Sequence, residues 1–421
     1  MLNKDGVREL AYVVTIDAIE PIVGSDNCEA AVVGGWRIMT RKETFKAGDL
    51  AIYFEIDSKV PETEQFAFLE KKHYKVKTQK YTFGGKGNFV SQGLLMHPND
   101  FGWTLAEDAD GNKIINWGDK ATDEMPYLSE GDFLTQALGV VYADPDDNKR
   151  KGHGGMDKYK KMAQRRPEIF TKPWARWMMR RNWGKKIMFF FFGKKKDNRN
   201  WPAWVVKTDE ERVQNMAWIL EDKTPWYATE KIDGTSTTFT MKGYGRKREF
   251  YICSRNVVFD TPEKEDKCFY DTNVYTEMAQ KYDVEHVLDC LMEYFSNVEN
   301  KPVEFVTLQG ETYGAGVQKR DYHLDGHDFK AFNLIVGFAG EQSRRLNPEE
   351  MTLILDDYGI PCVPIVSDNF VMPDTVDELL EIATDASAVD GDPREGLVFR
   401  SADGVRSFKA VSNEFLLKYH G

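Results

Sequence analysis

Short apolar runs separated by polar turns fill the first third of the chain. Runs rich in β-branched and aromatic residues predict strands at 12–16, 30–33, 36–39 and 50–56. Gly and Asp residues between the runs supply the turns. Short strands at this spacing are typical of a small barrel or sandwich. We therefore expect residues 1–140 to form one β-rich module.

Helical and strand patterns are mixed from residue 201 to residue 421. Strands are predicted at 250–253, 303–308, 331–338 and 396–399, and helices at 274–295, 348–358 and 376–384. The helix at 348 has a strong start, because Asn347 can cap it and Pro348 suits its first turn. This pattern predicts an α+β domain.

A basic segment joins these two parts at residues 141–200. Residues 148–200 contain 18 Lys and Arg but only three Asp and Glu, whereas the whole chain carries a net charge of −12. Tryptophans lie among these cations, and such a mixture suits base stacking and phosphate neutralisation. We expect Lys194, Lys195 and Lys196 to contact a polynucleotide. The alternative is a solvated helical connector whose tryptophans pack on a neighbouring domain.

The composition argues against a membrane protein and against a protein held together by disulfides or zinc. No run of 18 apolar residues exists, so we expect no membrane span. The five cysteines are scattered and form no C-x-x-C pair, which argues against a disulfide framework or zinc knuckle and for the reducing cytoplasm. No interface signal stands out, and we expect a monomer.

An ordered set of short motifs carries the chemistry. Lys231-Ile232-Asp233-Gly234 is followed by further segments in a fixed order: Ser254-Arg255-Asn256, Leu308-Gln309-Gly310-Glu311, Lys330-Ala331-Phe332, Glu395-Gly396-Leu397-Val398 and Ser407-Phe408-Lys409. The first motif alone is weak, but the ordered set resembles the covalent nucleotidyltransferase superfamily of polynucleotide ligases and capping enzymes. A two-sheet nucleotidyltransferase domain is therefore expected for residues 201–421.

The resemblance implies a role for each matching residue. Lys231 would attack the α-phosphorus of a nucleoside triphosphate, and Lys409 would contact the α-phosphate and assist. Asp233, Glu311 and Glu395 would hold Mg²⁺ or Mn²⁺ through water. The remaining nucleotide contacts would come from Glu230, Arg212, Arg255, Phe332, Glu311 and Glu395, and Asn256 would contact the polynucleotide.

These roles compete with plainer interpretations of the same residues. Lys231 could be a surface lysine beside a turn, and Phe332 could be a core residue of a buried strand. A lysine nucleophile must be a neutral amine, and we expect nearby cations, including other lysines and a bound metal, to favour that form. The last motif also departs from the K-x-K of related ligases, since Ser407 stands at its first position. Either Arg406 substitutes for the missing cation or the contact is absent.

One more segment points to a particular branch of this superfamily. Residues 207–215 (KTDEERVQN) resemble the opening of the catalytic domain in RNA ligases that have an N-terminal OB module, and 19–61 looks like an OB barrel. Arg212 and Gln214 would then face the adenylate pocket. Without the resemblance, the segment would be a helix start capped by Thr208 or Asp209.

The favoured hypothesis is an ATP-dependent RNA ligase that seals 3′-OH/5′-phosphate breaks, most readily nicks in duplex, with RNA at least on the 3′-OH side. It would use a lysyl-AMP intermediate and an adenylylated 5′ end. A capping-type enzyme that uses GTP is the first alternative. The second is a nucleic-acid binder with a decayed active site.

Overall fold

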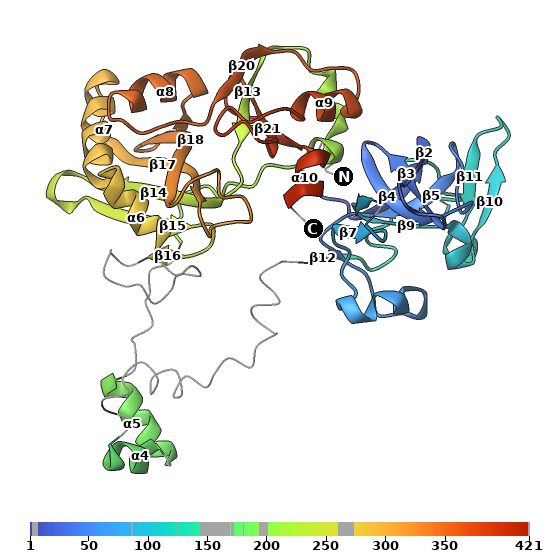
Figure 1. Cartoon of the computed structure of the whole chain (residues 1–421), viewed down its shortest axis with the longest axis horizontal. Coiled ribbons are helices and arrows are strands. Elements are labelled where there is room, and N and C mark those ends of the chain that lie inside the picture. Colours follow the sequence, from blue (N-terminus) through green and yellow to red (C-terminus); the bar gives the residue numbers. More distant parts are fainter. Residues whose placement is uncertain are drawn as a thin grey trace. The chain divides into compact units, whose positions relative to one another are not determined.

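The computed structural model describes residues 1, 7–85, 87–123, 125–143, 169, 172–179, 181–192, 201–259 and 273–419. They form two compact units, one made of Met1–Tyr142 and Trp201–Gly421 and the other of Ala143–Asn200. Figure 1 shows the strands of the N-terminal part in blue and the C-terminal sheets in green to red. Within the described residues, no helix has the length and apolar character needed to cross a membrane.

The N-terminal part is built from short antiparallel strands, and each strand predicted there is present. They pair as β1-β5-β9, β2-β3-β4, β7-β8, β10-β11 and β12-β6. The bounds are β1 (Ala11–Thr15), β2 (Ala18–Pro21), β3 (Cys28–Val33), β4 (Trp36–Arg41), β5 (Leu50–Phe54), β6 (Ser58–Lys59), β7 (Gln79–Thr82), β8 (Asn88–Ser91), β9 (Leu94–Met96), β10 (Thr104–Glu107), β11 (Lys113–Asn116) and β12 (Val141–Tyr142), with 3₁₀ turns η1 (Glu64–Lys72), η2 (Pro98–Phe101) and η3 (Gly118–Lys120).

Strand β5 is the centre of this part because all of its residues are buried. Successive side chains of a strand point to opposite faces. Leu50, Ile52 and Phe54 therefore join one hydrophobic cluster, while Ala51 and Tyr53 join another. Strand β5 is therefore packed against other elements on both of its faces.

The C-terminal part contains two antiparallel sheets, which confirms the predicted α+β fold. The four-stranded sheet has the order β20 (Ile365–Phe370), β13 (Trp226–Lys231), β21 (Gly396–Ser401) and β22 (Ser407–Val411). The six-stranded sheet has the order β16 (Val258–Phe259), β15 (Glu249–Ser254), β14 (Thr235–Lys242), β17 (Val303–Gly314), β18 (His327–Phe338) and β19 (Arg344–Arg345).

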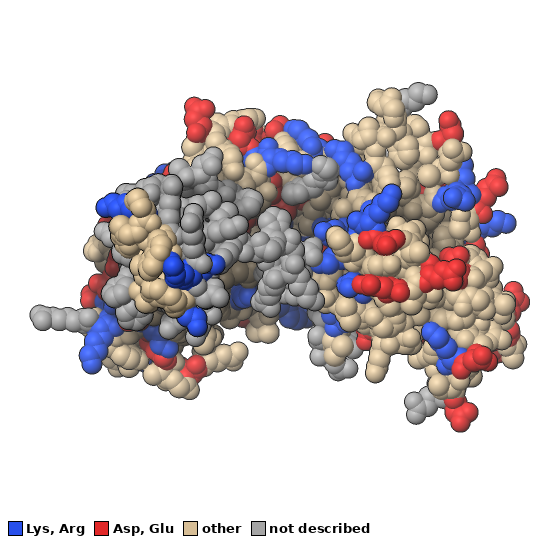
Figure 2. All heavy atoms as spheres, turned by 90° about the horizontal axis from the view of Figure 1, so that it is seen from below, with Lys and Arg blue, Asp and Glu red and all other residues tan. Residues whose placement is uncertain are grey.

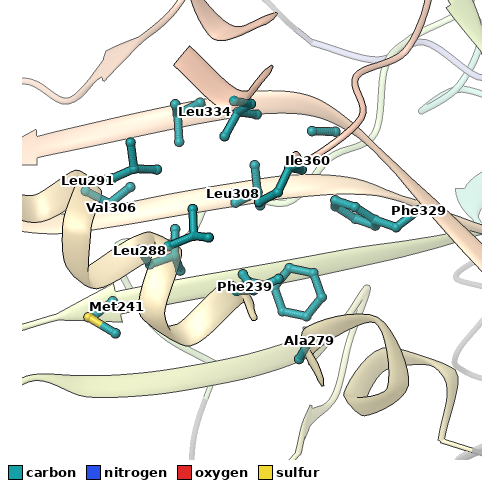
Figure 3. Close-up of a cluster of buried hydrophobic side chains, with 14 of the residues drawn as sticks. Phe239, Met241, Ala279, Leu288, Leu291, Val306, Leu308, Phe329, Leu334 and Ile360 are labelled. Atoms are coloured by element: carbon teal, nitrogen blue, oxygen red, sulfur yellow. The ribbon is translucent and has the colours of Figure 1, made fainter. Parts of the chain in front are cut away.

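Helices cover these sheets, and the apolar side chains packed between helix and sheet form the hydrophobic cores. Leu288 and Leu291 point from a helix onto Val306, Leu308 and other apolar side chains of the six-stranded sheet (Figure 3). A separate cluster fills the side of the four-stranded sheet that faces α9. The helices are α6 (Val274–Lys281), α7 (Val284–Val298), α8 (Pro348–Asp356), α9 (Val376–Ala383) and α10 (Asn413–Tyr419), with turns η4 (Val213–Asn215), η5 (Ala217–Glu221) and η6 (Gly245–Lys247).

Two sequence predictions need correction here. The single helix expected at 274–295 is two helices, because Asp283 adopts a left-handed conformation with φ 45° between α6 and α7. The helix start expected at Thr208 or Asp209 is also wrong. Residues 205–212 contain no helix, and the first turn is η4.

The second unit contains helices α4 (Pro173–Met179) and α5 (Asn182–Phe192). Trp177 and Trp183 lie edge to face with ring centroids 5.9 Å apart, and the Arg181 guanidinium lies 3.8 Å from the Trp177 ring. Lys194, Lys195 and Lys196 lie outside the described residues. On the face shown in Figure 2, the described basic side chains are interspersed with acidic ones.

Candidate active site

Three strands of the four-stranded sheet supply the floor of the candidate site. Strand β13 ends at Lys231, which pairs with Gly396 of β21. Two residues earlier, Thr229 pairs with Val398, which in turn pairs with Lys409 of β22. Because side chains alternate along strands, Lys231, Val398 and Lys409 share one face of the sheet.

This face borders a cavity of about 350 Å³, and six of the ten predicted site residues that the structure describes line it. They are Glu230, Lys231, Arg255, Glu311, Phe332 and Lys409. Phe332 is only partly buried, so it is not the buried core residue of the alternative interpretation. Arg212, Asp233, Asn256 and Glu395 are absent from the lining.

Lys231 is held by carboxylates rather than by cations. Its Nζ donates a hydrogen bond to Oε2 of Glu395 at 2.7 Å. Burial lowers the pKa of Lys231, but the negative charges of Glu395, Glu311 and Asp233 outweigh burial and raise it overall. These carboxylates favour the protonated amine, whereas a neighbouring lysine or a bound metal would favour the neutral one. Here Lys231 is protonated, and it must lose this proton before it can attack.

The groups around Lys231 have perturbed pKa values of their own. Burial lowers the pKa of Lys409, and the charge of Lys231 lowers it further. Burial raises the pKa of Glu311 to about 8 against the opposing effect of Lys231, and the negative charges of Glu395 and Asp233 add to the rise. Two lysines and three carboxylates thus interact within one small volume.

Hydrogen bonds hold the chain on each side of Lys231. The Glu230 carboxylate accepts one from the Ser387 hydroxyl and another from the Ala388 backbone N–H at 2.9 Å. The Asp233 N–H donates to the Tyr322 hydroxyl at 2.7 Å. The position of the lysine is thus fixed by the residues that flank it.

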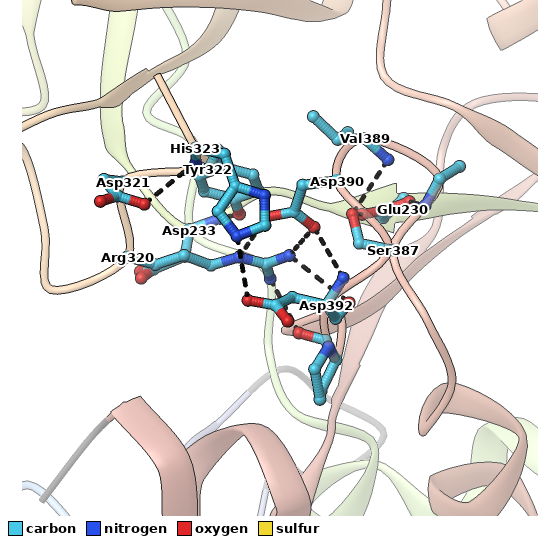
Figure 4. Close-up of polar contacts among 12 residues, drawn as sticks. Glu230, Asp233, Arg320, Asp321, Tyr322, His323, Ser387, Val389, Asp390 and Asp392 are labelled. Carbon is cyan, nitrogen blue, oxygen red and sulfur yellow. Dashed lines mark hydrogen bonds and ion pairs between the residues drawn. The ribbon is translucent and has the colours of Figure 1, made fainter. Parts of the chain in front are cut away.

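A buried ion pair supports both of these contacts (Figure 4). Arg320 pairs with Asp390, and each side chain is 2% exposed. Arg320 also donates to the Pro393 carbonyl at 2.8 Å and lies 4.1 Å from the Tyr322 ring. Since Asp390 belongs to the same loop as Ser387, one pair stabilises both the loop and Tyr322.

The opposite wall of the cavity is rich in ion pairs. Asp209 accepts from Arg255 Nη2 at 2.5 Å and lies 3.7 Å from Lys409 Nζ. Asn256 is exposed, and its Oδ1 accepts from Lys207 Nζ at 2.9 Å outside the cavity. The structure therefore brings Arg255 to the pocket but leaves its neighbour Asn256 at the surface.

Arg212 lies behind the site instead of in it. Its guanidinium is 5.6 Å from the ring of Trp36 in the N-terminal part. Burial lowers the pKa of Arg212, against the charge of nearby Glu395. The backbone around it runs alongside β22, where the Lys409 N–H donates to the Glu211 carbonyl at 2.7 Å.

Arg406 does not take the place of the cation that is missing at Ser407 in the last motif. Arg406 pairs with Asp222 at 2.5 Å and lies 5.2 Å from the Trp226 ring, so it does not line the cavity. Arg400 does line it, although sequence reasoning missed this residue. Strand alternation from Val398 would have found Arg400, since positions two apart share a face.

The acidic residues fit a hard divalent ion, which prefers oxygen ligands and keeps part of its water shell. Among the described residues, no three His, Cys, Asp or Glu side chains converge closely enough to hold a metal directly. Asp233, Glu311 and Glu395 all act electrostatically on Lys231. Their chemistry suits a metal bound through water beside the lysine.

Comparisons with known proteins agree with this arrangement. Residues 224–420 match the sequence model of the RNA ligase family, and residues 10–97 match that of an OB-fold domain. No curated protein sequence matches the chain.

Solved structures of Naegleria gruberi RNA ligase share the fold along the whole chain. The structure with ATP and manganese is 24% identical, with a TM-score of 0.58 over 98% of each chain. The structure with pyrophosphate is also 24% identical, with a TM-score of 0.60 over 98% of this chain and 99% of the relative. Residues 224–420 therefore resemble the RNA ligase family, residues 10–97 resemble an OB-fold domain, and the whole chain shares the fold of these solved RNA ligase structures.

Proposed function

We propose that this protein is an ATP-dependent RNA ligase that joins 3′-OH and 5′-phosphate ends, with Lys231 as its nucleophile. One observation carries the proposal: Lys231 and Lys409 line the same cavity as Glu311 and Phe332, next to Glu395. Structures of the N. gruberi RNA ligase hold ATP with manganese, AMP with manganese, or pyrophosphate.

The reaction would proceed in three steps, in which AMP is transferred twice and then released. Lys231 Nζ, after losing its proton, attacks the α-phosphorus, so that a P–N bond forms and pyrophosphate leaves. A 5′-phosphate oxygen then displaces the lysine and forms a 5′–5′ pyrophosphate linkage. Finally a 3′-hydroxyl attacks the former 5′-phosphate, and AMP leaves as the phosphodiester bond forms.

Residues of the cavity would assist in separate ways. Lys409 would stabilise the negative charge that develops on the α-phosphate. Phe332 would stack on the adenine, and Arg255 would contact the ribose or the phosphates. Asp233, Glu311 and Glu395 would hold Mg²⁺ or Mn²⁺, which neutralises phosphate charge when bound.

The polynucleotide would be a nicked duplex with RNA on the 3′-OH side. The OB-fold domain and the basic segment at 141–200 supply two groups that can grip strands on either side of a break. Asn256, which is exposed and accepts a hydrogen bond from Lys207, would contact the polynucleotide beside Arg255. Faster joining of free single strands than of matched nicks would overturn this preference.

Covalent labelling tests the chemistry directly. Purified protein, stripped of carried-over AMP by pyrophosphate, is incubated with α-labelled ATP and Mg²⁺ or Mn²⁺. We expect label on the wild type and none on Lys231→Ala, while Lys223→Ala, whose lysine pairs with exposed Asp374, serves as the matched control and retains label. Label from GTP alone would favour a capping-type enzyme, and label from neither nucleotide would leave a binding protein.

A further inference from the structure

Arg400 is a buried cation whose hydrogen bonds are incomplete. Its side chain is only 5% exposed, yet Nε and Nη1 have no hydrogen-bond partner among the described residues. Its closest counter-charge is Glu210, whose Oε1 lies 3.6 Å from Nη2. Burial lowers the pKa of Arg400 to about 10, so it remains charged near neutral pH. Buried donors without acceptors are unfavourable, and a ligand that supplies acceptors would relieve this cost.

The cavity is where such a ligand would bind, because Arg400 lines it. On β21, Lys231 pairs with Gly396, and Arg400 lies four residues farther along the strand. At about 3.4 Å per residue, this spacing is roughly 14 Å. The charges that act on Arg400 are those of Glu210 and Arg345, not those of Lys231 or Lys409. Arg400 therefore lies away from Lys231, whereas Lys409, the partner of Val398 on β22, is its diagonal neighbour on the same face.

Phe332 indicates which part of a nucleotide would bind at the Arg400 end of the cavity. The Arg400 guanidinium lies 6.0 Å from the centroid of the Phe332 ring. Val398, on the same strand face as Arg400, also lines the cavity. A nucleotide with its α-phosphate at Lys231 and its base beside Phe332 would direct an edge of that base toward Arg400.

We propose that Arg400 donates a hydrogen bond to a ring nitrogen of the adenine of ATP and so helps the enzyme to bind this base. A guanidinium only donates, and the adenine ring nitrogens N1, N3 and N7 accept. The proposal rests on the proposed function, since it assumes that ATP enters this cavity. It assigns Arg400 to the base and leaves the phosphates to Lys231 and Lys409.

A purely structural role is the competing explanation. Arg400 pairs across strands with Ser407, and the Ser407 hydroxyl contacts the same Glu210 that faces Arg400. In that case Arg400 would only attach β21 and β22 to the neighbouring segment. Loss of Arg400 would then weaken every nucleotide equally.

Analogues that lack single ring nitrogens separate the two explanations. Initial rates of covalent labelling are measured for ATP and for its 1-deaza, 3-deaza and 7-deaza analogues, with wild type and Arg400→Met. We expect one analogue to raise the wild-type KM about tenfold or more relative to ATP. We expect Arg400→Met to raise the KM for ATP by a similar factor and to be insensitive to removal of that same nitrogen.

Each alternative result has a definite meaning. Equal penalties for every analogue in both proteins, or an unchanged KM for ATP in Arg400→Met, would overturn the base contact. Weaker inhibition by inorganic pyrophosphate in the variant would assign Arg400 to phosphate instead, and would also overturn it. If circular dichroism shows that Arg400→Met is unfolded, Arg400→Lys takes its place, with a reduced penalty expected for the same analogue. Absence of label on wild type with ATP would overturn the proposed function itself, and this inference with it.

Discussion

Replacing Asp390 by asparagine removes one charge from the buried pair with Arg320 and changes the side-chain volume little. Arg320 would keep the Pro393 carbonyl and the Tyr322 ring but lose its counter-charge. The loop that contains Asp390 also carries Ser387, which binds Glu230 next to the nucleophile. The substitution therefore tests whether this ion pair supports both the fold and the chemistry.

The expected magnitude follows from the burial of the pair. Breaking a buried ion pair by removing one partner costs about 3–5 kcal/mol, because the remaining charge is left uncompensated. Both side chains are 2% exposed, so this range applies. In the pair of Lys223 with Asp374 the side chains are 48% and 89% exposed, and there the expected loss is about 1 kcal/mol or less.

Thermal unfolding and covalent labelling measure the two consequences. At about 2 °C per kcal/mol for a large domain, Asp390→Asn should lower Tm by about 6 °C or more, and Asp374→Asn by about 2 °C at most. Labelling of Lys231 should slow in Asp390→Asn at a temperature where the variant is still folded. Equal Tm shifts for the two variants would refute the argument from burial. An unchanged labelling rate would show that the loop does not position the lysine.

Three further outcomes are expected. Since the pKa of Glu311 is about 8, its carboxyl group must lose a proton before a divalent ion binds at lower pH. The Kd for Mn²⁺, measured by electron paramagnetic resonance, should therefore rise by up to about tenfold for each pH unit below 8 and be constant above pH 8. A pH-independent Kd would contradict this. Trp36→Leu should lower stability in urea unfolding by at least about 2 kcal/mol, because Arg212 loses its aromatic contact; wild-type stability would show that this contact does not matter. Gly396→Ala should lower the free energy of unfolding in urea by about 1–3 kcal/mol, because the added Cβ would lie 2.0 Å from the Ala410 carbonyl oxygen. Wild-type stability of this variant would contradict the close approach.

Local hydrophobic patterns in the sequence predicted most helices and strands, but not every residue at which a helix begins or ends. The strands of the N-terminal part follow from alternation and Gly turns, which act within a few residues. The break at Asp283 was missed because the apolar repeat of the helical pattern continues across it. A residue in the left-handed conformation leaves little trace in hydrophobic periodicity when it is not a glycine or a proline.

The candidate site was predictable where chemistry fixes residue types along the chain. Lys231, Glu311 and Lys409 lie in short motifs, and the structure brings all three to one cavity. Arg400 and the Asp390 loop were missed because their roles depend on cross-strand register and long-range contacts. The hydrogen bond from Lys231 to Glu395 was missed for a similar reason, since the two residues lie 164 positions apart in the sequence.

The division of the chain has a practical consequence for protein engineering. Met1–Tyr142 and Trp201–Gly421 form one compact unit although 58 residues separate them in the sequence. Contacts between distant segments join the two pieces, including Arg8 with Glu211 at 3.0 Å, Arg37 with Asp377 at 3.6 Å and Lys80 with the Leu417 carbonyl at 2.9 Å. A cut within 143–200 would therefore leave two fragments with complementary surfaces. This segment is the natural place to divide the enzyme into halves whose reassembly switches activity on.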